Sequence, residues 1–251
     1  MRNEEIKRAV KETYGRIARE GSSCCGSTCG DKTGETPLVS IAMNEKYDDA
    51  DEQIIAAADL GLGCGTPSAF ADLAEGMTVL DLGSGAGIDV FLAAKQVGPS
   101  GKAIGLDMTD EMLQKAHANM EKLGIRNAEF LKGDIENMPL ASDSIDYIIS
   151  NCVLNLVPDK KRAFREMYRV LRPEGKFTIS DIVTDGTHLF VDRENMHLWA
   201  SCIGGAIPKD EYLNSIREAG FTQVEVLHER PYVNESNEES GVTSITVSGT
   251  K

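Results

Sequence analysis

Three widely separated cysteines are the residues of this chain with the most distinctive chemistry. They are Cys64, Cys152 and Cys202. Taken singly, a cysteine is most often a small buried apolar residue. Three thiolates that converge instead form a soft donor set, which selects thiophilic metals or metalloids. The sequence therefore raises the question of whether the fold brings these thiols together.

Cys64 has the most unusual surroundings of the three. It lies in the segment LGLGCGTP, in which three glycines and a proline predict a loop and not the interior of a helix or strand. Flanking glycines make a poor core, so we expect a presented thiol here, on the most mobile of the three carrier segments. A second group, Cys24, Cys25 and Cys29, lies in the Gly/Ser/Thr-rich segment 21–37. No C-x-x-C spacing occurs, so neither a zinc ribbon nor a thioredoxin motif is indicated.

A glycine-rich turn follows the first predicted strand of the central region. The segment VLDLGSGAG holds Asp81, Gly83, Gly85 and Gly87 at the strand-to-helix turn where an open parallel sheet binds its ligand. A dinucleotide fingerprint would need glycine at position 88, which is isoleucine, so binding of a nicotinamide dinucleotide is disfavoured. The carboxylate of Asp81 suits an ammonium group better than a pyrophosphate.

Two further aspartates end the next two predicted strands. Asp107 lies 20 residues after Gly87, at the position whose carboxylate accepts from both hydroxyls of a ribose. Asp134 ends the third strand, where a carboxylate can accept from an adenine amine. Together with the glycine turn, these residues outline a ligand that carries an ammonium group, a ribose and an adenine. The predicted set also contains Met108 and Ile135, which follow these two aspartates, and Asn151, which follows the fourth predicted strand.

Strands and helices alternate through the region that carries these residues. Apolar runs of strand length begin at 77, 102, 128, 145 and 176, and amphipathic helical segments separate most of them. This alternation predicts an α/β fold with a doubly wound, mostly parallel sheet. We also expect an amphipathic N-terminal helix over 2–20, a helix over 208–219, and a closing pair of strands at 222–229 and 242–249.

The composition excludes several classes of function. The chain has 251 residues, of which 41% are hydrophobic, so it can bury a proper core. Its formal net charge of −14 disfavours nucleic acid as a partner. We find no apolar run of membrane-span length and no apolar signal core at the N-terminus, so we expect a cytoplasmic protein without a membrane partner.

The cofactor segments resemble the class I S-adenosylmethionine (SAM) methyltransferases over about residues 70–183, and imply a Rossmann-like sheet. Several further segments are similar to one family among them, the arsenite methyltransferases. General methyltransferases share the glycine turn but lack LGCGTP and SNCVLNL. The matching segments, which span roughly residues 60–206, are LGCGTP, VLDLGSGAGIDVFLAA, GLDMTDEML, ISNCVLNLVPDKKRAFREMYRVL and SCIGGA, with YGRIA in the first helix in addition.

The resemblance implies that Cys64, Cys152 and Cys202 hold trivalent arsenic while SAM supplies the methyl group. Methyl transfer oxidises arsenic to the pentavalent state, and thiols are a natural source of the two electrons that restore it. Cys24, Cys25 and Cys29 are then candidates for a redox relay, reopened by an external reductant such as thioredoxin or a small thiol. An incidental cysteine cluster or a weak metal site is the alternative for these three residues.

The resemblance also suggests a division of the chain. Residues 1–60 would form the N-terminal helix and Cys-rich loop, 61–184 the SAM-binding domain, and 185–251 the substrate-site insertion with the C-terminal helix and strands. Two other functions stay open. One is a SAM-dependent C- or O-methyltransferase of a small organic acceptor such as a quinone or sterol. The other is a thiol protein that sequesters a metalloid, or stores zinc, without catalysis.

Overall fold

One mixed sheet forms the centre of the molecule. The structure is a computed structural model that describes residues 2–20, 51–185, 199, 204–233 and 239–251. Within these residues, seven strands lie in the order β3-β2-β1-β4-β5-β7-β6. The strands are β1 (Thr78–Leu82), β2 (Lys102–Asp107), β3 (Ala128–Lys132), β4 (Ile145–Asn151), β5 (Leu171–Thr184), β6 (Thr222–Val233) and β7 (Glu239–Thr250).

The sheet is parallel except at one strand. β1 to β5 pair in parallel, while β7 is antiparallel to both β5 and β6, so β7 alone runs against the others. The order reverses at β1, which lies between β2 and β4. The carboxyl ends of β1, β2 and β4 therefore meet at one edge, where open α/β sheets bind their ligands. The predicted α/β class, with its mostly parallel sheet and closing strand pair, is confirmed.

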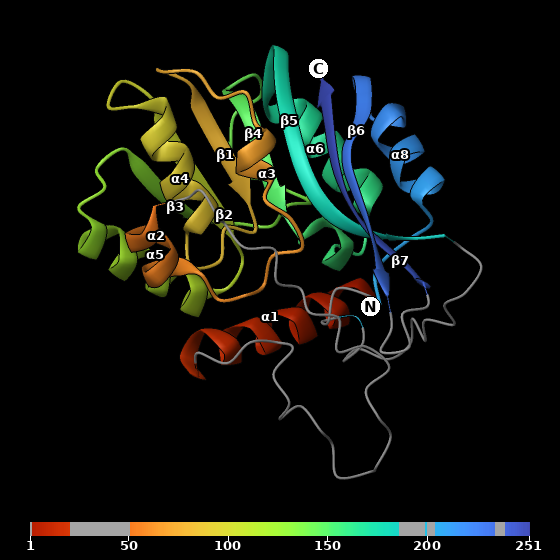
Figure 1. The fold of residues 1–251 in the computed structure, drawn as a ribbon, viewed down its shortest axis with the longest axis horizontal. Helices are drawn as coiled ribbons and strands as arrows, with labels where there is room; N and C mark the ends of the chain where they lie inside the picture. The colour runs from red at the N-terminus through yellow and green to blue at the C-terminus, as the bar shows by residue number, and fades with distance from the viewer. Residues whose placement is uncertain (1, 21–50, 186–198, 200–203, 234–238) are drawn as a thin grey trace.

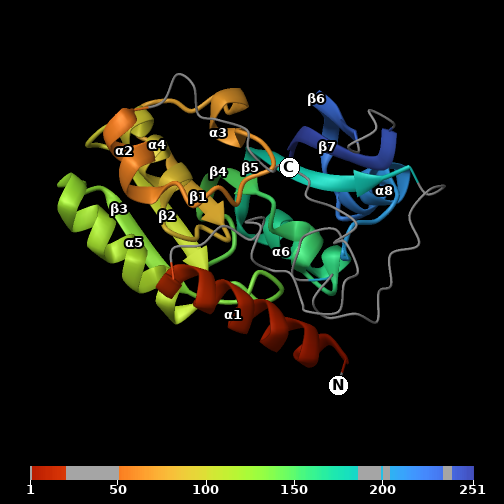
Figure 2. The same ribbon diagram turned by 60° about the horizontal axis from the view of Figure 1, so that its bottom comes forward.

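Helices cover both faces of the sheet (Figures 1 and 2). One face packs against α2, α4 and α5, and the other against α6 and α8. Side chains that alternate along a strand enter opposite cores, since the strand repeat is two residues: Leu80 lies in the core with α6, and Val79 in the core with α4. The helices are α1 (Arg2–Glu20), α2 (Glu52–Ala58), α3 (Pro67–Phe70), α4 (Ile88–Val97), α5 (Asp110–Leu123), the short 3-10 helix η1 (Leu154–Leu156), α6 (Lys160–Val170) and α8 (Lys209–Glu218).

Helix α1 crosses the edge of the sheet at which the ligand site is expected (Figure 1). Its predicted apolar stripe is buried, with Ile6, Val10 and Ile17 each no more than 4% exposed. Its polar side is held by ion pairs. Lys7 lies 2.7 Å from the Asp134 carboxylate and 2.6 Å from that of Glu136. Packing and charge pairing together therefore fix α1 over the site.

The fifth strand is longer than its sequence pattern suggests. The apolar run predicts a strand from residue 176, but β5 begins at Leu171, directly after α6 and before Pro173. Leu171 pairs with Ile145 of β4, and the register then shifts before Tyr147 pairs with Lys176. An irregularity in the strand pairing thus accommodates the proline-containing segment, which the sequence pattern alone marks as a break.

The predicted helices at 2–20 and 208–219 are confirmed by α1 and α8. None of the helices in the described ranges is long and apolar enough to cross a membrane. The division of the chain at 60 and 184 stays a prediction, although β6 and β7 do join the same sheet as β1 to β5.

Two glycines at helix ends allow a test of the packing around α4. Gly87 precedes α4 with φ of 97°, and a Cβ there would lie 2.7 Å from Phe91 and 2.9 Å from Phe130. Gly124 ends α5 with φ of 66°, and a Cβ added to it would have no atom within 4 Å.

We expect Gly124→Ala to lower the free energy of unfolding by about 1–2 kcal/mol, through left-handed backbone strain. Gly87→Ala should lose about 1–3 kcal/mol more, because the methyl group overpacks the two rings. Urea denaturation of both variants measures the difference. Equal losses would contradict the tight packing at Gly87.

Candidate functional site

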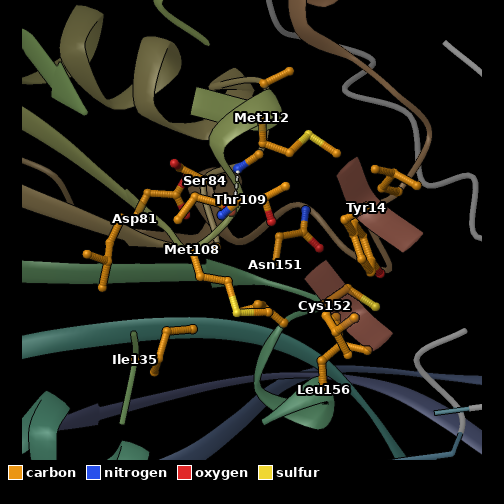
Figure 3. A pocket seen from close by; sticks show the side chains of 18 of the residues that line it. Tyr14, Asp81, Ser84, Met108, Thr109, Met112, Ile135, Asn151, Cys152 and Leu156 are labelled. Atoms are coloured by element: carbon orange, nitrogen blue, oxygen red, sulfur yellow. Dashed lines mark hydrogen bonds between the residues drawn. The ribbon is translucent and has the colours of Figure 1, made fainter. Parts of the chain in front are cut away.

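A cavity opens at the carboxyl ends of β1, β2 and β4, beneath α1. It is lined by residues from these three strand ends and from the segment after β3, from α1 and from the loop before α3. Figure 3 shows Tyr14, Met108, Asn151 and Cys152 among the side chains around it. The predicted cofactor residues that line it are Asp81, Gly83, Gly85, Asp107, Met108, Asp134, Ile135 and Asn151, while Gly87 lies outside the lining, at the start of α4.

The cavity is strongly acidic. Asp81, Asp89 and Asp107 all line it, and Lys7 is the one basic residue among the described residues of the lining. Burial raises the pKa of the Asp81 carboxyl well above its usual range, and the charges of Asp89 and Asp107 add to that effect. Carboxyl groups crowded in this way favour a ligand that brings positive charge with it.

Asp107 closes the glycine turn as well as lining the cavity. One of its oxygens accepts from the Gly85 N–H at 3.0 Å, and the other from the Thr109 N–H at 2.8 Å. Burial raises the pKa of this carboxyl, while the hydrogen bonds from Thr109 and Gly85 oppose the rise. The carboxylate is thus held in a fixed orientation, with acceptor positions left for a ligand's hydroxyl groups.

Asp134 has a partner that the sequence pattern does not reveal. Its carboxylate forms the ion pair with Lys7 and also accepts from the Glu136 N–H at 2.9 Å. Two apolar residues, Met108 and Ile135, line the same cavity as Asp134. A flat base held between apolar side chains and near this carboxylate is compatible with the predicted adenine position.

Cys64 is held by hydrogen bonds from two distant segments. Its N–H donates to the Asn151 side-chain oxygen at 3.1 Å, and its carbonyl accepts from the Ser244 hydroxyl at 2.6 Å. The Asn151 amide also donates to the Gly65 carbonyl at 2.7 Å. A Cβ at Gly63 would lie 2.8 Å from that amide nitrogen, so this glycine lets the loop approach Asn151.

The expectation of a presented thiol at Cys64 is therefore wrong, while the relative mobility of its loop stays a prediction. The Cys64 side chain is 0% exposed and packs in an apolar cluster with Ile6, Val10 and Cys152. The glycines serve close packing of the loop rather than exposure of the thiol.

Cys152 follows β4 directly and lines the cavity. Its φ of 57° is uncommon for a residue with a side chain, and its N–H donates to the Ser180 carbonyl at 2.8 Å. Strained backbone of this kind persists only where surrounding contacts enforce it, and it is frequent at functional sites. The bond to β5 enforces it here.

Cys64, Cys152 and Asp181 form one buried cluster. A ligand atom of each, the two sulfurs and a carboxylate oxygen, lies within 4.8 Å of the other two. The two cysteines are reduced thiols. Asp181 lies in β5 and is 1% exposed, and its carboxylate accepts from the Tyr212 hydroxyl at 3.0 Å. The structure thus brings together two of the three predicted thiols, with a carboxylate that the sequence analysis did not single out.

The other predicted thiols lie outside the described residues. These are Cys202, of the proposed arsenic site, and Cys24, Cys25 and Cys29, of the proposed relay. Sequence reasoning missed Asp89, Lys7 and Asp181. Asp89 could have been predicted, since it is an acidic residue in the first helical turn after the glycine loop. No local pattern predicts Lys7 or Asp181, because each contacts residues that are distant in the sequence.

The pKa of Asp181 generates a prediction for stability. Burial raises this pKa from 3.8 to about 7, against the opposing charge of Lys160. Between these values the folded protein keeps a proton that the unfolded chain has lost, so the contribution of Asp181 to stability falls as the pH rises from about 4 to 7. Asp181→Asn lacks this proton equilibrium.

We therefore expect the stability of Asp181→Asn, relative to the parent protein, to rise between pH 4 and pH 8. About three pH units at about 1.4 kcal/mol each set an upper limit of about 4 kcal/mol. Urea denaturation of both proteins across this range measures the difference between their free energies of unfolding. Contributions that the two proteins share cancel in this difference. If this difference stays constant with pH, the pKa of Asp181 is the same in the folded and the unfolded protein.

Comparison with known proteins places the chain in a family. Residues 73–220 match a family profile described as a methyltransferase domain. An arsenite methyltransferase of Halobacterium salinarum is 46% identical over 232 residues, which cover 89% of this chain and 59% of that protein. The human arsenite methyltransferase is 31% identical, with 88% of this chain and 59% of that protein covered. The chain thus spans about three fifths of the length of these relatives.

A solved structure agrees with the family profile and with these two relatives. It is that of an arsenic (III) S-adenosylmethionine methyltransferase from Chlamydomonas reinhardtii, with a TM-score of 0.68 and 33% identity, covering 86% of this chain and 74% of that one. These matches confirm the predicted family and fold class, and the enzyme class with SAM as its cofactor. The chain belongs to the methyltransferase-domain family and, within it, to the arsenite methyltransferases.

Proposed function

We propose that this protein methylates trivalent arsenic, held by cysteine thiolates, with SAM as the methyl donor. The observation that carries the proposal is the cluster of two buried thiols, Cys64 and Cys152, of which Cys152 lines the acidic cavity. The names of the relatives support arsenite as the substrate. A methyltransferase of an organic acceptor would have no need of converging thiols.

The residues of the cavity fit SAM. Its positive charge suits the carboxyl groups of Asp81, Asp89 and Asp107, and the ribose hydroxyls suit the oriented Asp107 carboxylate. Met108 and Ile135 would flank the adenine. When bound, SAM supplies an electrophilic methyl group. The remaining work of the chain is to hold the substrate near that group and to exclude water.

The proposed substrate supplies its own nucleophile. Trivalent arsenic keeps a lone pair in a pyramidal site, and thiolates on the other side of the atom orient that pair. Cys64 and Cys152 would hold arsenic beside the cavity that Cys152 lines, and Cys202 would supply the third thiolate. The chain needs no general base for the transfer, because arsenic carries no proton that must be removed.

Formation of the arsenic–carbon bond raises arsenic to the pentavalent state. Its return to the trivalent state takes two electrons, which two thiols release as they form a disulfide and lose two protons. We assign this role to Cys24, Cys25 or Cys29, with an external thiol reductant that reopens the disulfide. Such exchange needs reduced thiols at the start, which supports the cytoplasmic location in this proposal.

The first test compares the parent protein with Cys64→Ser and Cys152→Ser. Incubated with SAM, arsenite and a thiol reductant, the parent protein should release methylated arsenicals, identified by mass. Each serine variant should lose at least one methylation step, since serine is a poor ligand for trivalent arsenic. Binding of SAM, measured by calorimetry, should stay within about threefold of that of the parent protein and serves as the control for folding.

Two results would contradict the proposal. Full activity of Cys152→Ser on a quinone or sterol would favour the organic-acceptor enzyme, and stoichiometric arsenite binding without any methylated product would favour sequestration. The thiol relay can be tested in the same assay without reductant, where turnover should stop after about one cycle. Peptide mapping that then finds Cys24, Cys25 and Cys29 all still reduced would remove the relay.

A second test concerns the cofactor. Asp107→Asn should weaken SAM binding by about ten- to a hundredfold, because a charge-assisted hydrogen bond contributes roughly 1.5–3 kcal/mol. Asp143→Asn, which removes a carboxylate before β4 that pairs with Lys251 and does not line the cavity, is the matched control and should bind SAM normally. Unchanged affinity of Asp107→Asn by calorimetry would exclude the ribose contact.

A further inference from the structure

Asp181 is a buried carboxylate that the proposed reaction leaves without a role. It stands beside the thiols because of strand register. Asn151 at the end of β4 pairs with Ser180 of β5, and the Cys152 N–H donates to the Ser180 carbonyl. Asp181 is the next residue of β5, and its carboxylate lies within 4.8 Å of both sulfurs.

The carboxylate has several donors already and room for another. The Ile182 N–H donates to one oxygen and the Tyr212 hydroxyl to the other, each at 3.0 Å, and the backbone of Asn155 contributes further. An ionised carboxylate offers about four acceptor positions. These contacts fix its orientation and leave capacity for a hydrogen bond from a bound ligand.

A purely structural role does not account for the charge at this place. An asparagine could accept from the Ile182 N–H through its oxygen and donate its amide N–H to the Tyr212 oxygen, without the desolvation penalty of a buried carboxylate. Burial raises the pKa of Tyr212, and the charges of Asp181, Cys64 and Cys152 raise it further. The tyrosine, the carboxylate and both thiols therefore form one electrostatic unit, which favours a role shared with the thiols.

Arsenite can supply the donor for this additional hydrogen bond to Asp181. In water it is As(OH)3, and each thiol that binds arsenic displaces one hydroxyl group as water, with the thiol proton leaving in that water. Loading on Cys64 and Cys152 thus gives a dithiolate that keeps one As–OH group and releases two waters, without change of oxidation state. This hydroxyl group is a hydrogen-bond donor next to Asp181.

We propose, on the basis of the proposed function, that the Asp181 carboxylate accepts the hydrogen bond of the As–OH group that remains when arsenite is bound by Cys64 and Cys152. Asp181 thereby makes the two-thiol site selective for arsenicals with three exchangeable positions. A monosubstituted arsenical has two, and both are used by the thiols. The proposed third thiolate, Cys202, replaces the hydroxyl group at a later stage of loading.

The experiment compares two ligands in a Cys202→Ser background, in which the hydroxyl group stays on arsenic. Arsenite keeps one hydroxyl group after it binds two thiols, whereas phenylarsine oxide keeps none. At pH 8, Asp181→Asn should weaken arsenite binding about tenfold, because a charged acceptor is replaced by a neutral one. Its binding of phenylarsine oxide should stay within about twofold. Calorimetry measures both affinities.

Asp185→Asn is the matched control, because it removes an exposed carboxylate just beyond the end of β5. It should leave both affinities unchanged. An equal loss of both ligands in Asp181→Asn, or no loss of arsenite, would overturn the inference. Failure of phenylarsine oxide to bind the Cys202→Ser parent would instead overturn the Cys64–Cys152 pair, and with it the proposed function.

X-ray absorption spectroscopy measures the atoms bound to arsenic, and this measurement does not depend on the folding of Asp181→Asn. Arsenite bound to the Cys202→Ser protein should show two As–S bonds and one As–O bond. Three As–S bonds would mean that another thiol fills the third position, and the role of Asp181 would be excluded.

Discussion

The side-chain amide of Asn151 joins the two halves of the site. Its oxygen accepts from the Cys64 N–H and its nitrogen donates to the Gly65 carbonyl, so one amide satisfies both polarities of the loop. A carboxylate or a hydroxyl group could not replace it with the same geometry, because the amide carries a fixed acceptor and a fixed donor. Asn151 also lines the cofactor cavity. The thiol loop and the cavity are therefore positioned by the same residue.

The register of β4 against β5 supplies the remaining geometry. It places Cys152 at the end of one strand and Asp181 in the adjacent one, with a backbone hydrogen bond between the two segments. The left-handed backbone at Cys152 is held by that bond. Functional sites often contain such strain, supported by the structure around them. Here the rigid sheet is the support, and the loop of Cys64 packs onto it.

Buried carboxyl groups are a recurring feature of this site. Asp81, Asp107 and Asp181 are each held in surroundings that raise their pKa, so the folded protein gives up stability to keep them there. Such arrangements are expected where ligand binding, and not folding, has selected the residues. Lys7 of α1 forms ion pairs with two other carboxylates, Asp134 and Glu136, and thereby couples the covering helix to the acidic edge.

The sequence by itself determined the features that depend on nearby residues. Alternating apolar patterns predicted the strands and helices, the glycine turn and the aspartates at strand ends predicted a cofactor edge, and the cysteine-containing segments predicted the family. Only the tertiary structure decided which distant groups touch. Cys64 contacts Asn151, 87 residues away, and it is buried, although its flanking glycines suggested a presented thiol. Asp181 reached the thiols through strand register, and Lys7 reached Asp134 across 127 residues. Local sequence carries no record of such pairs, since they arise from the packing of whole elements.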